Sequence, residues 1–250
     1  MGFFSVEERE RVRDGVLGMA RSDDRVVAGA EVGARSQGEG DQWSDLDLTF
    51  GLRHGASLSE DLNDWTPDLR KRFAAIHLFD LPSSSSVYRV FLLPGCLQVD
   101  LSFTPEVDFG ARGPKFKLLF GSAKERPFAQ PPSAEYTFGL AVHHAVRARF
   151  CIERGRGWQA EYWISALRDE ALSLACRLRG LESSNGRGYD QLPPEVLAQF
   201  GDALIHSLDR EELLRALACA VDGLLTVGAD SDPRAGQLVH ELRHLSNRNG

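Results

Sequence analysis

Two segments of the chain alternate strictly between polar and apolar residues, which predicts β-strands with one face buried and one face open. The first covers residues 45–50, and its polar positions are Asp45, Asp47 and Thr49. The second covers residues 97–103, and its polar positions are Gln98, Asp100 and Ser102. Both polar faces carry carboxylates, so these two strands are candidates for carrying functional residues.

The remaining elements of the first half alternate between strand and helix patterns. A helix is expected over residues 6–20, since Ser5 and Glu8 have the spacing of a capping box. A second helix is expected over residues 58–75, with Pro67 as a break or as the start of a further turn. Short apolar or alternating runs predict further strands at residues 25–32, 76–81 and 87–93.

The character of the chain changes after the strand at residues 97–103. Residues 111–132 are rich in Gly, Pro and Lys and are expected to form a linker, and no strand pattern follows them. Helical patterns recur at residues 133–154, 158–181, 194–208, 211–227 and 233–245. The sequence therefore predicts an α+β protein, with a short mixed twisted sheet in residues 1–110 and an all-helical bundle in residues 133–250.

Composition restricts the possible functions. The chain has 250 residues and a formal net charge of −7, which argues against a nucleic-acid partner and suits a cationic small substrate. Its four cysteines are scattered without the spacing of a zinc site. No run is long enough to cross a bilayer and the N-terminus lacks a signal-peptide core, so we expect no membrane association and a cytoplasmic location.

A glycine-bounded loop precedes the first acidic strand and gives it a chemical context. The loop runs Gly33-Ala34-Arg35-Ser36-Gln37-Gly38, and Asp45 and Asp47 follow it. Neighbouring carboxylates repel each other, and a divalent cation removes that cost. Oxygen ligands suit Mg²⁺, and Asp100 on a neighbouring strand would complete the site. Because a glycine turn frees backbone N–H groups to bind phosphate, the combination predicts a metal–nucleotide site.

This arrangement resembles the DNA polymerase β-like nucleotidyltransferase superfamily. The superfamily signature is a Gly-Ser or Gly-Gly pair, about ten residues, an Asp-x-Asp between apolar residues, and a third acid on a later strand. Gly33-Ala34, Asp45-Leu46-Asp47 and Asp100 match this order. The resemblance implies that Asp45, Asp47 and Asp100 bind two Mg²⁺ ions, that Asp100 is also catalytic, and that Gly33, Ala34, Arg35 and Ser36 hold the nucleotide. Ala34 departs from the pattern, because a small hydroxyl residue or glycine is usual there.

The Trp43-Ser44 lead-in and the helical second half look most like the aminoglycoside and related antibiotic nucleotidyltransferases. That branch implies transfer of a nucleoside monophosphate, AMP from ATP or the equivalent from another NTP, to a hydroxyl of a small molecule such as an aminoglycoside. It also implies a general base from the helical half, for which Glu161 is the first candidate and Asp169 the second. The alternatives are nucleotidylation of a protein or RNA hydroxyl, and a non-catalytic, antitoxin-like nucleotide-binding partner. Nothing in the sequence indicates an oligomeric state.

Overall fold

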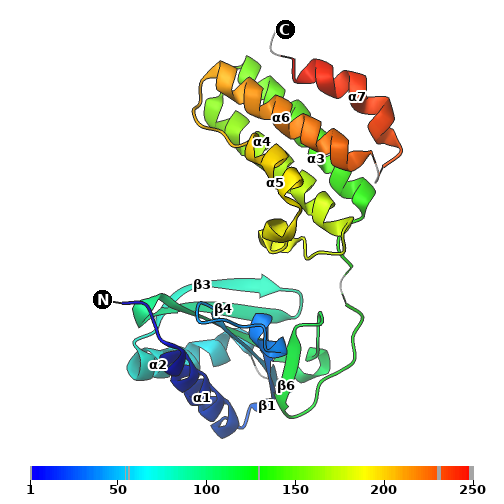
Figure 1. The fold of residues 1–250 in the computed structure, drawn as a ribbon. Helices are drawn as coiled ribbons and strands as arrows, with labels where there is room; N and C mark the ends of the chain where they lie inside the picture. Colours follow the sequence, from blue (N-terminus) through cyan, green and yellow to red (C-terminus); the bar gives the residue numbers. More distant parts are fainter. Residues whose placement is uncertain (1, 54, 56, 129, 230–231, 248–250) are drawn as a thin grey trace. The chain divides into compact units, whose positions relative to one another are not determined.

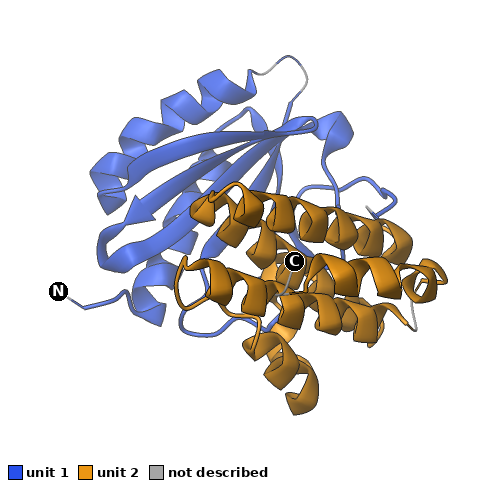
Figure 2. Cartoon of the chain, turned by 90° about the horizontal axis from the view of Figure 1, so that it is seen from above, with its two compact units in different colours: residues 1–130 blue, residues 131–250 orange. Residues whose placement is uncertain are grey.

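The computed structural model of this chain describes residues 2–53, 55, 57–128, 130–229 and 232–247 (Figure 1). The chain divides into two compact units, residues 1–130 and 131–250 (Figure 2). Unit 1 contains the sheet and two helices, and unit 2 is helical, so the predicted α+β class is confirmed. Each unit has its own apolar core.

The sheet of unit 1 has the strand order β3-β4-β5-β2-β1-β6. In this sheet β2 and β5 run parallel, whereas the other neighbouring strands run antiparallel. Its strands are β1 (Val26–Val32), β2 (Leu46–Leu52), β3 (Ile76–Ser83), β4 (Ser86–Leu93), β5 (Leu97–Pro105) and β6 (Phe116–Phe120). The two strands with the alternating acidic pattern are therefore direct neighbours at the centre of the sheet.

Two helices cover one face of this sheet (Figure 1). Helix α1 (Val6–Ser22) begins with the expected capping box: the Ser5 hydroxyl accepts from the Glu8 backbone N–H at 3.1 Å, and the Ser5 N–H donates to the Glu8 carboxylate at 2.8 Å. The apolar side chains of β2 pack in one core with residues of both helices, including Val16 of α1 and Trp65 of α2. The alternate residues of β2 and β5, among them the acids, consequently lie on the opposite face.

Helix α2 (Leu58–Phe73) continues through Pro67, so the expected break there was wrong. A proline inside a helix removes one backbone hydrogen bond and usually costs several kcal/mol, about 3 or more. Here Trp65 and Leu69, on either side of Pro67, are buried against the sheet, whereas Pro67 itself is exposed. Burial of the flanking side chains favours the continuous helix.

Strand β6 lies inside the segment 111–132 that the sequence predicted as a linker. It pairs antiparallel with β1, with Val32 opposite Phe116 and Glu31 opposite Lys117. Its sequence, Phe-Lys-Leu-Leu-Phe, has no period-two pattern, so the run gives little indication of a strand. The segment therefore supplies an edge of the sheet in addition to the connection between the units.

Unit 2 consists of five helices in its described residues: α3 (Ala134–Glu153), α4 (Gly157–Arg177), α5 (Pro194–Gly201), α6 (Arg210–Gly228) and α7 (Arg234–Leu245). Helices α3, α4 and α6 pack together, and α5 and α7 lie against α6. The bundle occurs where the apolar stripes predicted it, although α5 ends at Gly201 rather than near residue 208. None of the helices in the described ranges is long and apolar enough to cross a lipid bilayer.

Candidate functional site

Three carboxylates meet on the polar face of the sheet in unit 1. Asp47 on β2 and Asp100 on β5 are direct partners in the parallel register of the two strands. Asp45 immediately precedes β2. The three residues, which we call the acidic triad, each place one carboxylate oxygen within 4.8 Å of the others. The structure thus brings together all three acids that the sequence singled out.

The alternation of the strands fixes the direction in which the triad points. Leu46, Leu48 and Leu101 are fully buried beneath α1 and α2. Their sequence neighbours Asp47 and Asp100 must then face the other side of the sheet, where both are half-buried. Burial of the leucines therefore holds two carboxylates in a cross-strand pair despite their mutual repulsion.

The electrostatic environment of the triad favours a bound cation. Burial raises the pKa of Asp100 above its ordinary value, and the charge of Asp45 raises it further. The amide of Gln98 opposes this rise by donating to both Asp100 oxygens, at 3.1 and 3.3 Å. A divalent cation would stabilise all three ionised carboxylates at once. Oxygen donors at this spacing suit Mg²⁺, which prefers one or two carboxylates together with water and phosphate oxygens.

Gly33 occupies a position that only glycine can fill. Its φ of +74° lies in the region that side chains disfavour. A Cβ atom built on Gly33 would also stand 2.5 Å from Oδ2 of Asp47. The end of β1 therefore passes against the Asp47 carboxylate, which places the backbone of the glycine loop directly beside the triad.

The rest of the loop forms a compact turn that we call the phosphate loop, Gly33–Gly38. Residues Ala34–Gln37 make one 3-10 turn, and Gly38 closes it in the left-handed conformation. The Ser36 hydroxyl donates to the Gly33 carbonyl at 2.7 Å, so its proton stabilises the turn itself. The N–H groups of Ala34 and Arg35 begin the 3-10 turn, a position at which they have no acceptor within it.

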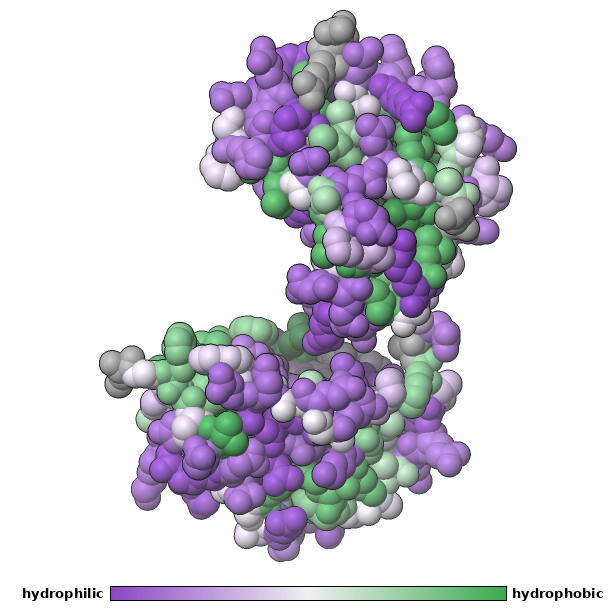
Figure 3. Space-filling view, in the orientation of Figure 1, coloured by the Kyte–Doolittle hydropathy of each residue, from purple (hydrophilic) through white to green (hydrophobic). Residues whose placement is uncertain are grey.

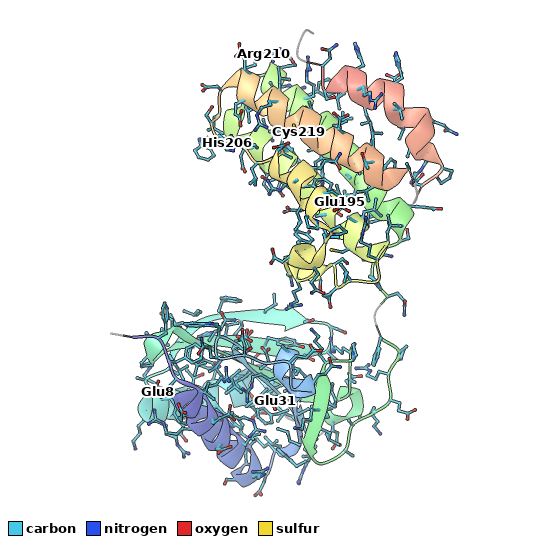
Figure 4. The ribbon with its side chains drawn as sticks, viewed as in Figure 1. Glu8, Glu31, Glu195, His206, Arg210 and Cys219 are labelled. Atoms are coloured by element: carbon cyan, nitrogen blue, oxygen red, sulfur yellow. The ribbon has the colours of Figure 1, made fainter. Side chains whose placement is uncertain are left out.

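The Arg35 side chain is held in ion pairs on the helix side of the sheet. Its Nε donates to Glu31 at 3.0 Å, and its terminal nitrogen donates to Glu10 at 2.7 Å. Glu31, labelled in Figure 4, is only 3 % exposed and also lies 3.4 Å from the Arg13 guanidinium. These contacts assign the Arg35 guanidinium to anchoring the phosphate loop on α1 and β1, and leave its backbone as the part available to a nucleotide.

A second segment contacts the phosphate loop from the side of β6. The Gln37 amide donates to the Pro114 carbonyl at 3.1 Å, and Lys115 Nζ lies 3.8 Å from the Glu39 carboxylate. Since Val32 pairs with Phe116 in antiparallel register, Lys115 stands next to Gly33. The residue that precedes β6 therefore brings a cation beside the loop.

Comparisons with known proteins find solved structures that resemble this chain. No family model matches it, and no curated protein matches it. An aminoglycoside 6-adenyltransferase from Bacillus subtilis aligns with 95 % of this chain and 98 % of its own, at 10 % identity and a TM-score of 0.40. This chain is thus similar to an aminoglycoside 6-adenyltransferase only at a low level. We therefore base the function on the geometry of the triad and the phosphate loop.

The predicted general base lies in unit 2. Glu161 is on α4, is half-buried and accepts a hydrogen bond from the Ser165 hydroxyl at 2.8 Å. Asp169 lies further along the same helix, and its side chain is 57 % exposed. Asp169 also lies 3.3 Å from the Arg168 guanidinium, and the catalytic role of both acids stays a prediction.

The sequence placed Thr49 and Ser102 on the same polar faces as the acids but indicated no role for them. Thr49 and Ser102 follow Asp47 and Asp100 by two residues, share their face, and stand opposite each other across β2 and β5. The alternating pattern that identified the acids was also the sequence signal for these two hydroxyl groups. Arg112 donates to the Ser83 carbonyl and to the Ser86 hydroxyl, at the turn between β3 and β4. It lies in an irregular loop that no sequence pattern identifies.

Proposed function

We propose that this chain is a Mg²⁺-dependent nucleotidyltransferase that moves a nucleoside monophosphate, AMP from ATP as the first choice, to a hydroxyl of a small molecule. The observation that carries the proposal is the convergence of Asp45, Asp47 and Asp100 beside the backbone of Gly33. A cluster of carboxylates against a glycine turn suits a metal-bound triphosphate. The nucleotidyltransferase resemblance of the sequence motifs agrees with this chemistry.

Each residue has a defined task in the proposed reaction. Asp45, Asp47 and Asp100 would hold Mg²⁺, which neutralises charge on the triphosphate when bound. The backbone of Gly33, Ala34 and Arg35 binds phosphate oxygens, with Ser36 shaping the turn. The acceptor oxygen forms a bond to the α-phosphorus, the bond from this phosphorus to the bridging oxygen breaks, and pyrophosphate leaves. The acceptor proton passes to a carboxylate of unit 2, Glu161 as first choice and Asp169 as second, or to Asp100.

The acceptor is proposed to be a cationic, hydroxyl-bearing ring compound of the aminoglycoside type. Trp158 and Tyr162, one turn apart on α4, are 78 % and 61 % exposed. Exposed aromatic rings next to Glu161 and Asp169 suit an amine-bearing ring system. The net charge of −7 is favourable to such a ligand and unfavourable to RNA.

The direct test is incubation with Mg²⁺, each labelled NTP, and a panel of aminoglycosides and lincosamides. We expect pyrophosphate release that depends on an acceptor, and its loss in Asp45→Asn and Asp47→Asn. The matched control is Asp14→Asn, which makes the same change at a side chain that is 75 % exposed on α1 and should retain full activity. Absence of release with every NTP, together with no Mg–NTP binding by calorimetry, would contradict the proposal.

The general base is tested separately. If Glu161 accepts the acceptor proton, Glu161→Gln should lower kcat by roughly 10²- to 10⁴-fold, with NTP affinity unchanged. Asp169→Asn, on the same helix, serves as the comparison and should have a smaller effect. The measurement is kcat against pH for both variants. A Glu161→Gln enzyme with a wild-type pH profile would transfer the role to Asp100.

A further inference from the structure

A small cavity of about 140 Å³ lies on the polar face of the sheet in unit 1 and contains none of the triad carboxylates. Its floor is formed by hydroxyl-bearing side chains of β2, β4 and β5, namely Thr49, Ser86, Tyr88 and Thr104. Its roof is the segment 108–116, with the side chains of Phe109, Arg112 and Lys115. We call it the hydroxyl pocket.

The hydroxyl pocket begins one row of side chains beyond the triad. Thr49 follows Asp47 by two residues on the same face of β2. Two residues of a strand span about 7 Å. Tyr88 and Ser102 are partners across β4 and β5, just as Thr49 and Ser102 are across β2 and β5. A ligand that is bound at the triad and extends along the strands therefore reaches this pocket.

Two cationic side chains line the pocket: Lys115, which lies 3.8 Å from the Glu39 carboxylate, and Arg112. Its guanidinium donates to the Ser86 hydroxyl at 2.9 Å and to the Ser83 carbonyl at 3.3 Å, both neutral acceptors. Among the residues that the structure describes, no carboxylate forms an ion pair with it. Asp108, which also lines the pocket, is paired with Arg126 at 3.0 Å. A part-buried guanidinium with only neutral partners favours an incoming anion.

A buried hydroxyl beside the floor gives an independent indication of a ligand. Ser102 is 1 % exposed, and its Oγ has no hydrogen-bond partner among the described residues. It lies between Thr49 and Tyr88, two lining residues. An unpaired buried hydroxyl costs free energy that a polar group entering the pocket can recover.

From this cavity, its uncompensated guanidinium and its hydroxyl floor, we propose that the hydroxyl pocket binds a phosphate-class oxyanion. The volume is close to that of a cavity that holds one benzene molecule, about 150 Å³. It therefore accommodates one phosphate group. The anion has two possible sources, a phosphate of the NTP or its pyrophosphate product, and free inorganic phosphate. Only the first source rests on the proposed function.

The test is titration calorimetry of the full chain with inorganic phosphate and with pyrophosphate, in EDTA so that the triad holds no divalent cation. We expect Arg112→Gln to weaken binding by about tenfold or more, as for loss of a charged hydrogen bond. Arg53→Gln is the control, because it removes the same charge at an exposed position of unit 1. Thr49→Val, which keeps the shape and removes a floor hydroxyl, should weaken binding several-fold without lowering the thermal midpoint.

The two sources are separated by competition and by kinetics. If the pocket takes a phosphate of the nucleotide, NTP displaces inorganic phosphate and Arg112→Gln raises KM for the NTP. If it takes free phosphate, both ligands bind together. Equal phosphate affinity in the wild type and in Arg112→Gln overturns the proposal, as does the absence of binding at millimolar phosphate in the wild type. Phosphate binding by a protein without transferase activity would uphold the pocket and reject the proposed function.

Discussion

Gly33 brings the backbone of the phosphate loop against Asp47, a proposed metal ligand. Gly33→Ala would place a Cβ 2.5 Å from Asp47 Oδ2 and would strain a residue at φ +74°. We expect this variant to displace the Asp47 carboxylate, to lower the affinity for Mg²⁺ and to reduce transferase activity by at least about tenfold. The measurements are Mg²⁺ titration and kcat.

Gly38 provides the matched control within the same loop. It also has a positive φ, +78°, but a Cβ there meets no atom within 4 Å. Gly38→Ala should therefore cost only the backbone strain, about 1 kcal/mol of stability, and leave the affinity for Mg²⁺ unchanged. Similar Mg²⁺ affinities in the two alanine variants would show that the contact with Asp47 does not matter.

For single residues, the sequence predicted which acids lie together better than it predicted what their neighbours contact. Alternation and spacing identified Asp45, Asp47 and Asp100, because each acid has at least one buried apolar neighbour that fixes where it points; these neighbours are Leu46, Leu48, Val99 and Leu101. The side-chain role of Arg35 was not accessible, since its partners Glu10 and Glu31 come from other elements and no local pattern connects them. Ser36 was predicted to hold the nucleotide, and its hydroxyl bond to the Gly33 carbonyl was not foreseen because it depends on the turn geometry.

Among the elements, α1, β1 and α2 are joined by a charged network around Arg25. Its guanidinium forms a bidentate pair with Asp23 at 2.8 and 2.9 Å and also bonds Asp64 at 2.7 Å and Asp61. The Trp65 indole donates to Asp23 at 2.8 Å. The hydrogen bond from Arg25 lowers the pKa of Asp23 to about 2.

This pKa gives a pH dependence of stability. The folded value lies below the ordinary value of 3.8, so the Asp23 carboxylate stabilises the fold above that pH and loses its contribution as the pH falls through about 2. The contribution is about 2 kcal/mol at neutral pH. We expect Asp23→Asn to lower the unfolding free energy at pH 7 and to converge with the wild type near pH 2. A difference that stays constant over this range would exclude ionisation as its cause.

The elements themselves were predictable wherever burial imposes a period on the sequence. Strands β2 and β5 and the helices of unit 2 have one buried face and were found. β6 and the continuation of α2 through Pro67 depend on packing against distant residues, Val32 for the strand and the sheet for the helix. Their local sequences argue for a linker and a break, which tertiary contacts override.

For the whole molecule, the two units bury separate cores. The core of unit 1 draws on residues 12–103, and the core of unit 2 draws on residues 138–242. In unit 1, the edge strand β3 also presents apolar side chains to solvent, within the green area over that strand in Figure 3; they include Ile76, Phe79 and Leu81. An exposed apolar edge favours association between copies, so an isolated unit 1 should be studied at low concentration.

Separate cores suggest separate folding, and the proposed division of labour follows from it. We expect residues 1–130 alone to unfold in one cooperative thermal transition whose midpoint rises with Mg²⁺, since the triad lies wholly within this unit. Asp47→Asn in the same fragment is the control and should abolish the Mg²⁺ effect without abolishing the transition.

The fragment should transfer no nucleotide to an acceptor, because Glu161 and the exposed aromatic residues of α4 belong to unit 2. A fragment that remains unfolded would show that unit 1 needs unit 2 for its stability. Acceptor-dependent transfer by the fragment would instead remove α4 from the proposed reaction.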